Sequence, residues 1–250
     1  MPGSEFVMET KVPVGVALRG GTLAFGDKVI FESLDLDIPA GRTTCLLGPS
    51  GVGKSSLLRM IADISPEAAA NRLVSSDGGA IEGRIAYMDQ RDLLLPWLSV
   101  LDNVTLGARL RGAAPDRQRA QALLAKVGLA GESKSLPAAL SGGMRQRAAL
   151  ARTLMEDRAI VLMDEPFSSL DALTRLRLQD LAAGLLAGRT VLLVTHDPLE
   201  ALRLGHRILV MRGSPARIAS VLEPDGLPPR PADDPNLHGL AAAILAELAG

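Results

Sequence analysis

Apolar and polar positions alternate along the first part of the chain. From about Val14 to Ile38 apolar residues largely recur at every second position, with interruptions at Gly20-Gly21 and Gly26-Asp27. A period of two is typical of half-buried strands, and glycine-containing pairs between such runs are typical of turns. The pattern therefore predicts antiparallel hairpins with turns at both pairs.

Four short segments further along predict strands of another kind. Continuous apolar runs make up all or the end of three of them: Thr43 to Leu47, Ala159 to Met163 and Val191 to Val194. The fourth is the segment from Arg84 to Met88. Continuous apolar runs are typical of parallel strands that are covered on both faces. Helical spacing over 173–186 separates two of them, which predicts a strand–helix–strand unit.

Helical spacing accounts for much of the remaining chain. Asp197-Pro198 predicts a helix start, because Asp is a favoured N-cap and Pro fits the first helical position. Two segments predict loops: residues 65–83, rich in Ala, Ser and Gly, and the Pro-rich stretch after Pro224. Further helices are expected over 54–62, from 102 to about 131 with a break at 112–115, over 144–155 and over 237–248.

Composition narrows the classes of function. The 250 residues suffice for one large domain, and a net charge of −1 argues against a nucleic-acid partner. Cys45 is the single cysteine, so a disulfide framework is excluded and a reducing compartment is indicated. We find no apolar run near the roughly 20 residues that cross a bilayer and no signal peptide. The first residues, Met1 to Phe6, are interpreted as a cloning tag.

A glycine-rich stretch follows the strand predicted at 43–47. Residues 48–55, Gly-Pro-Ser-Gly-Val-Gly-Lys-Ser, match G-x-x-x-x-G-K-[ST] between a predicted strand and a predicted helix. Glycines let backbone N–H groups converge on phosphate oxygens, and the helix N-terminus favours anions. Lys54 then reaches the β- and γ-phosphates and Ser55 binds Mg²⁺. A chance match in an ordinary glycine turn is the alternative, and the strand–turn–helix context disfavours it.

Two other predicted strands end in residues suited to acid–base chemistry. Asp164 and Glu165 close the run from Ile160, and strand alternation would point them in different directions. Asp164 suits a Mg²⁺ ligand, and Glu165 suits a general base for the attacking water. His196 follows the next apolar strand, at the end where such sheets bind ligands, which favours contact with the γ-phosphate. A solvated acidic pair and an ordinary polar histidine are the alternatives.

A second small cradle precedes the helix predicted at 144–155. Ser141-Gly142-Gly143 stands there, between the glycine-rich loop and the Asp164-Glu165 strand. The full order of motifs resembles the ATP-binding cassette (ABC) ATPases over about residues 16–220. The motifs that carry the resemblance are 48–55, Gln90, Leu140 to Gln146, Asp164-Glu165, Ser169 to Asp171 and His196.

The resemblance implies a fold and an assembly. The fold is α/β, a P-loop NTPase (RecA-like) core with an antiparallel β subdomain and a helical subdomain that carries the signature motif, at about 91–150. The ATPase domain would span 14–222, after a tag or disordered segment at 1–13 and before a Pro-rich tail at 223–250. Two copies would pair head to tail as a homodimer, so that Ser141 to Gly143 of one chain cap the γ-phosphate of the ATP held by Lys54 of the other.

The resemblance also implies roles for single residues. Phe25 would stack on adenine, although a place in the core is its alternative. Gln90 would contact Mg²⁺ or the attacking water, and Asp171 would cross the dimer interface. Ser56 replaces a commoner threonine, and Asp63 stands where the family commonly has glycine. The implied ATP-binding residues are Phe25, Gly48, Pro49, Ser50, Gly51, Gly53, Lys54, Ser55, Ser56, Ser141, Gly142, Gly143 and Asp171; the implied catalytic residues are Glu165, His196, Gln90 and Lys54; and the implied Mg²⁺ ligands are Ser55, Gln90 and Asp164.

Three classes of phosphate-loop protein are candidates: a GTPase switch, a soluble cassette protein and a subunit of a membrane importer. A GTPase switch is disfavoured because Asn71, Asn103 and Asn236 lie in no Asn-Lys-x-Asp context. A soluble cassette of DNA repair or translation is the alternative, but twin cassettes and long coiled-coil insertions are not found. The interpretation is therefore an energy-coupling ATPase subunit of a bacterial importer, peripheral on the cytoplasmic face of the inner membrane.

The segment after Gln90 indicates the importer's partners. Leu93 to Trp97 is apolar and Trp-bearing, which favours an anchor for a membrane permease at Leu95-Pro96-Trp97, with a substrate-binding protein as an indirect partner. Packing of this loop on its own helical insert is the alternative. Residues 84–104 resemble the nitrate, sulfonate and taurine importer cassettes and are closest to those for the hydroxymethylpyrimidine precursor of thiamine.

Overall fold

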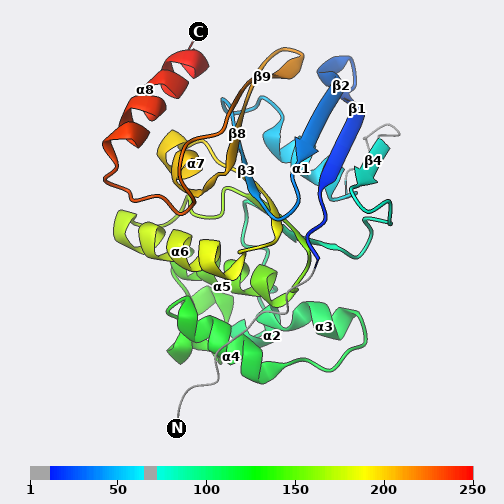
Figure 1. Cartoon of the computed structure of the whole chain (residues 1–250). Coiled ribbons are helices and arrows are strands. Elements are labelled where there is room, and N and C mark those ends of the chain that lie inside the picture. The colour runs from blue at the N-terminus through cyan, green and yellow to red at the C-terminus, as the bar shows by residue number, and fades with distance from the viewer. Residues whose placement is uncertain (1–11, 65–71, 250) are drawn as a thin grey trace.

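Two β-sheets form the framework of the molecule, seen in the computed structural model of Figure 1. The structure describes residues 12–64 and 72–249. The tag expected over 1–13 therefore lies almost wholly outside the described residues, as does the first part of the loop expected over 65–83. The strands are β1 (Val16–Phe25), β2 (Lys28–Ile38), β3 (Thr43–Leu47), β4 (Arg72–Ser75), β5 (Ile85–Met88), β6 (Ile160–Asp164), β7 (Thr190–Val194), β8 (Arg207–Gly213) and β9 (Ala216–Leu222).

The larger sheet has the order β5-β6-β7-β3-β8-β9, and the smaller has the order β2-β1-β4. In the larger sheet β5, β6, β7, β3 and β8 pair in parallel, whereas β9 pairs antiparallel to β8. Carboxyl ends of parallel strands meet at one edge of a sheet. The segments that follow β3, β5, β6 and β7 are therefore brought together there.

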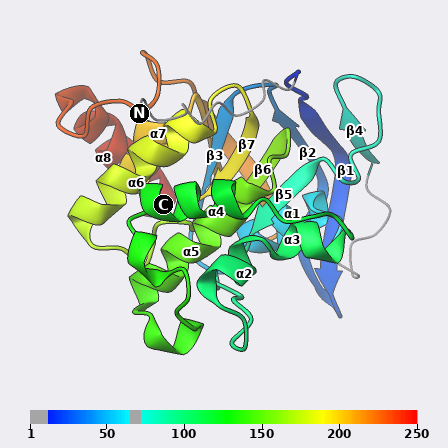
Figure 2. The same ribbon diagram turned by 90° about the horizontal axis from the view of Figure 1, so that it is seen from below.

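Most helices cover one face of the larger sheet, whereas α1 packs on the other face together with β1 and β2. Figures 1 and 2 show α2, α4 and α5 grouped as a helical layer next to α6, with β1, β2 and β4 on the opposite side. Within the described residues no helix is long and apolar enough to cross a membrane. The helices are α1 (Lys54–Ile61), α2 (Val100–Val104), α3 (Leu106–Leu110), α4 (Arg117–Lys126), α5 (Gly142–Met155), α6 (Ala172–Leu185), α7 (Pro198–Leu204) and α8 (Pro235–Ala249).

The central strands are apolar on both faces because each face has its own core. In β3, Cys45 and Leu47 pack in the core on the helical side, and Leu46 packs in the core shared with β1, β2 and α1. The same alternation holds along β6, where Val161 faces one core and Leu162 the other. This arrangement confirms the parallel, doubly covered strands predicted from the continuous apolar runs.

Several predicted turns and loops are corrected. Gly20-Gly21 is not a turn: both residues lie inside β1, where the register with β2 shifts and Gly20 has φ 64°. They form a bulge, which accommodates an extra residue without ending a strand. Within the loop expected over 65–83, β4 pairs with β1, and no prediction was made for the β8–β9 hairpin.

Candidate functional site

The phosphate loop runs from β3 to α1. Gly51 and Gly53 have φ of 79° and 110°, which glycine adopts without strain. A Cβ on Gly48 would collide with the Met211 carbonyl oxygen, and one on Gly53 would lie 2.6 Å from Cγ2 of Ile30. The glycines therefore permit this close path at the N-terminus of α1, where an anion is favoured.

The Lys54 side chain hydrogen-bonds the backbone of the phosphate loop. Its side chain is buried, and Nζ donates to the carbonyl oxygens of Gly48 at 2.8 Å and Pro49 at 3.0 Å. Burial lowers the pKa of Lys54, whereas the nearby Glu165 and Asp164 raise it. The ammonium group thus bonds the loop and also interacts electrostatically with both carboxylates.

Asp164, the last residue of β6, has the character of a cation ligand. It is 1% exposed, and neither carboxylate oxygen forms a hydrogen bond of ordinary geometry with a described residue. Burial raises the pKa of Asp164, and the neighbouring Ser55 hydroxyl lowers it. Oxygen ligands in small number, completed by water and phosphate, are what Mg²⁺ prefers. Ser55 and Asp164 therefore fit Mg²⁺.

Glu165 has partners on both sides. Its Oε1 lies 3.1 Å from Nδ1 of His196, and its Oε2 accepts from Nε2 of Gln90 at 3.4 Å. The reason predicted for its separation from Asp164 is wrong, because Glu165 lies beyond the strand with φ 47°. A left-handed turn, and not the strand pleat, sets its direction.

One cleft brings most of the predicted ATP-binding residues together. It has a volume of about 370 Å³. Phe25 lies in its wall at the end of β1 with 46% of its surface exposed, so the alternative of a core position is wrong. The lining residues are Phe25, Ile30, Ser50, Gly51, Gly53, Lys54, Ser55, Ser56, Gln90 and Glu165.

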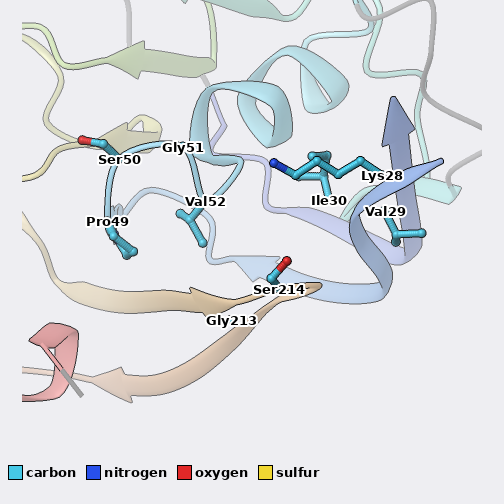
Figure 3. A pocket seen from close by; sticks show the side chains of 9 residues that line it. All are labelled: Lys28, Val29, Ile30, Pro49, Ser50, Gly51, Val52, Gly213 and Ser214. Atoms are coloured by element: carbon cyan, nitrogen blue, oxygen red, sulfur yellow. The ribbon is translucent and has the colours of Figure 1, made fainter. Parts of the chain in front are cut away.

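A second hollow adjoins this cleft along the phosphate loop. Figure 3 shows it between that loop, the start of β2 and the turn from β8 to β9. Ile30, Ser50 and Gly51 line both hollows. The two hollows therefore adjoin each other at these three residues.

The second cradle begins α5 and lies outside the cleft. Ser141 is the N-cap, and its Oγ accepts from the Met144 N–H at 3.2 Å. Ser141 and Gly142 are exposed, and neither lines the cleft around Lys54. The structure therefore places the Ser141 segment, predicted to be a second phosphate cradle, apart from the phosphate loop of the same chain.

Asp171 begins α6 in the same manner. Its carboxylate accepts from the Thr174 N–H at 3.0 Å, and this backbone hydrogen bond lowers the pKa of Asp171. The residue is exposed. An exposed carboxylate at the start of a helix is compatible with the interface role expected of Asp171.

Gln146 is a functional candidate that the sequence reasoning did not single out. It is 5% exposed on α5, and Nε2 donates to the carbonyl oxygens of Pro166 at 3.1 Å and Glu165 at 3.4 Å. The helix that begins at Ser141 is thereby tied to the backbone of the predicted base. Its place in the signature segment was the only signal available.

The loop after Gln90 is fixed by side chains from two helices. Asn103 is fully buried, and its side-chain oxygen accepts from the Leu95 N–H. Its Nδ2 donates to the carbonyl oxygen of Leu95 and to two further carbonyl oxygens. Arg152 of α5 donates to Leu93 O at 2.8 Å and Asp92 O at 2.6 Å. Trp97 in this loop is 70% exposed, so the alternative of packing on its own insert is wrong for this side chain.

Known proteins resemble this chain in sequence and in fold. A family model described as ABC transporter matches residues 31–168. The chain belongs to the ABC transporter family. It is therefore an ATPase of the cassette type, and the resemblance and fold class predicted from the motifs are confirmed.

Three similar proteins illustrate the relationship. An uncharacterized ABC transporter ATP-binding protein of Haemophilus influenzae is 43% identical over 240 residues, covering 94% of this chain and 99% of the relative. The aliphatic sulfonates import ATP-binding protein SsuB 2 of Rhodococcus jostii is 42% identical over 243 residues, covering 94% and 93%. The dimeric, ADP- and Pi-bound structure of the ATP-binding cassette MJ0796 matches with a TM-score of 0.75 and 28% identity, covering 85% of this chain and all of that one.

Proposed function

We propose that the cassette hydrolyses Mg²⁺-bound ATP in the cleft along the phosphate loop and couples this reaction to import of a small solute. The observation that carries the proposal is the convergence of Lys54, Ser55, Gln90 and Glu165 on one cleft, directly beside the unpartnered carboxylate of Asp164. Each group in that set suits a different part of phosphoryl transfer.

Each side chain has a separate task in this proposal. Lys54 and the loop N–H groups bind the β- and γ-phosphates, and Phe25 stacks on the base. Ser55, Asp164 and Gln90 hold Mg²⁺, which neutralises phosphate charge when bound. Glu165 takes the proton from the attacking water, and His196, 3.1 Å from Glu165, orients it and contacts the γ-phosphate.

The active assembly in this proposal is a head-to-tail homodimer. Ser141 to Gly143 of one chain complete the site around Lys54 of the other, which agrees with the separation of the two cradles on one chain. The structurally similar cassette MJ0796 is a dimer. The ATPase domain spans 14–222 with a helical subdomain at about 91–150, and residues 223–250 form a tail.

The exposed loop at Leu95-Pro96-Trp97 is proposed as the anchor for permease subunits. An exposed tryptophan on a loop fixed by Asn103 and Arg152 is a rigid apolar knob, and such residues dominate binding energy at interfaces. Bound in this way, the cassette would be peripheral on the cytoplasmic face of the inner membrane. A substrate-binding protein would act only through the permease.

For the solute we favour an aliphatic sulfonate. Relatives that name a solute, from Rhodococcus jostii and Delftia acidovorans, name aliphatic sulfonates, and the comparisons do not support the thiamine-precursor expectation. Uptake of labelled sulfonate, taurine, nitrate and hydroxymethylpyrimidine in a deletion strain distinguishes these solutes. Restored uptake of the pyrimidine alone would overturn our preference.

Co-purification with the permease tests the anchor. Trp97→Ala should reduce recovery of the cassette with the permease from membranes, while ATP binding is unchanged. Leu227→Ala is a matched control, because Leu227 is 83% exposed in the tail. Undiminished recovery of Trp97→Ala would remove this residue from the interface.

A further inference from the structure

A buried carboxyl group lies behind the Glu165–His196 pair. Glu200 of α7 is 6% exposed and lines a cavity of about 40 Å³ together with Glu165, His196 and Arg175. A cavity of this size has room for water. Glu200 therefore lines the same small cavity as the two residues proposed to act on the attacking water.

The local sequence predicts a different position for this side chain. Asp197 is the N-cap of α7 and Glu200 is its third residue, which is the spacing of a capping box. In that motif the glutamate would accept the N–H of the N-cap residue. Here the Asp197 N–H donates to Thr195 Oγ1 at 3.1 Å instead, so capping does not account for the direction of Glu200.

Glu200 instead joins two elements of the site. Its Oε2 accepts from Nε2 of Gln179, a buried residue of α6, at 2.9 Å. It also interacts with the hydroxyl of Thr195, which stands next to His196. The helix that begins at Asp171 is thereby connected through Glu200 to the turn that carries His196.

The charges around Glu200 set its protonation. The pKa of Glu200 is raised to about 7; burial is the largest cause, and the charge of Asp197 acts in the same direction. Thr195, Gln179 and Arg175 act in the opposite direction. Three kinds of group face it besides these. Glu165 and His196 line the same cavity, and Cys45 of β3 interacts with it electrostatically. Arg203, on the same helix as Glu200, donates to Gln179 and Asp180.

We propose that Glu200 is a positioning residue for ATP hydrolysis: its neutral form holds the Thr195–Asp197 turn so that His196 stays against Glu165. The inference rests on the roles proposed above for Glu165 and His196. An ionised Glu200 would add a second negative charge to the cavity of Glu165 and would attract His196 and Arg175. Burying a carboxyl group without a directly bonded cation lowers the stability of the fold, and a packed apolar side chain would stabilise it more. A role in the site, and not stability, therefore explains a glutamate at this position.

The rate of ATP hydrolysis as a function of pH tests this inference. Glu200→Gln keeps the shape and acceptor of the neutral form, so kcat should match the native protein at about pH 6 and exceed it about threefold or more at about pH 8.5. Glu200→Ala should lower kcat about tenfold with KM for ATP unchanged. A ratio of Gln variant to native kcat that is constant with pH would overturn the proposal.

Two controls separate this inference from other effects. Asp180 of α6 forms an ion pair with Arg203, which lies on the same helix as Glu200, and Asp180 does not line the cavity. Asp180→Asn alters this ion pair and should leave kcat unchanged. A loss in Asp180→Asn equal to that in Glu200→Ala would indicate a general effect on α6 and overturn the inference. If Glu165→Gln and His196→Ala both retain native rates, the proposed function itself is wrong; if they are inactive and the Glu200 ratio is constant, only the inference fails.

Discussion

Glu165 and His196 meet across the ends of two adjacent parallel strands, with Oε1 of Glu165 3.1 Å from Nδ1 of His196. Gln90, from the end of β5, donates to the other carboxylate oxygen. Three neighbouring strand ends thus fix one carboxylate from both sides. Such support restricts the orientation of a general base, which is what proton abstraction from a positioned water requires.

The first prediction concerns this carboxylate. Glu165→Gln should bind ATP normally but hydrolyse it about 10²–10⁴-fold more slowly, because a positioned base contributes that range. Phosphate release and size-exclusion chromatography with ATP measure the two effects, and an ATP-held dimer should accumulate. Glu223→Gln, at an exposed carboxylate, is the control. A loss below about threefold would assign the role of base elsewhere.

A second prediction concerns Gln146, which donates to the backbone carbonyl oxygens of Glu165 and Pro166. Gln146→Leu keeps the volume but leaves the carbonyl oxygens of Glu165 and Pro166 without this donor. Since small displacements of a reacting group are costly, kcat should fall about tenfold with little change in ATP affinity. Gln118→Leu on the exposed face of α4 is the control. Native kcat in Gln146→Leu would limit the residue to packing.

The stability of the phosphate-loop helix gives a third prediction. Asp63, just beyond α1, has φ 57°, and its N–H bonds Met60 O at 3.0 Å. Glycine adopts this left-handed conformation without the strain of a side chain. Asp63→Gly should therefore raise the free energy of unfolding by about 0.5 kcal/mol, measured by denaturant titration. A decrease would show that the aspartate side chain contributes more than its backbone strain costs.

The central strands and the phosphate loop could be predicted because each depends on a pattern of neighbouring residues. The runs in β3, β6 and β7 are apolar on both faces, and the phosphate-loop glycines are required by backbone geometry, so each leaves a signal within a few residues. The β8 run from Ile208 to Met211 carries the same signal and was missed. β4 has four residues and exists through pairing with β1, which is distant in sequence.

The contacts of the site were less accessible from sequence because they depend on tertiary packing. The left-handed φ of Glu165 is not favoured by its residue type, and it arises where β6 turns between Gln90 and His196. Glu200 has the spacing of a capping residue, yet it packs against Gln179 of another helix. Local rules identified Glu165 only as part of a motif and did not single out Glu200.

The fourth prediction links Glu200 to stability. Burial raises the pKa of Glu200 from 4.5 to about 7, so the folded state binds the proton more tightly than the unfolded chain. Its contribution is fully present below about pH 4.5 and is lost as pH rises through about 7, by an amount on the order of 3 kcal/mol. Glu200→Gln should lack this decline in denaturant titrations between those pH values. Parallel pH curves for the two proteins would contradict the raised pKa.

The fifth prediction tests whether the two cradles act on different chains. Lys54→Ala should lose ATP phosphate contacts, and Ser141→Arg should block the proposed γ-phosphate cap with bulk and charge. Each variant homodimer then carries two damaged sites. In a mixed dimer both substitutions fall in one composite site, so the other site is native.

Mixing the two inactive variants should therefore restore hydrolysis at one site for each heterodimer. Single-turnover measurements on heterodimers isolated with two affinity tags give the result without requiring both sites to cycle. A double variant carrying both substitutions on one chain, mixed with native protein, is the matched control, since in that dimer each composite site carries one lesion. Silence in the mixed variants, together with activity in the control, would mean that Ser141 serves the ATP bound by its own Lys54.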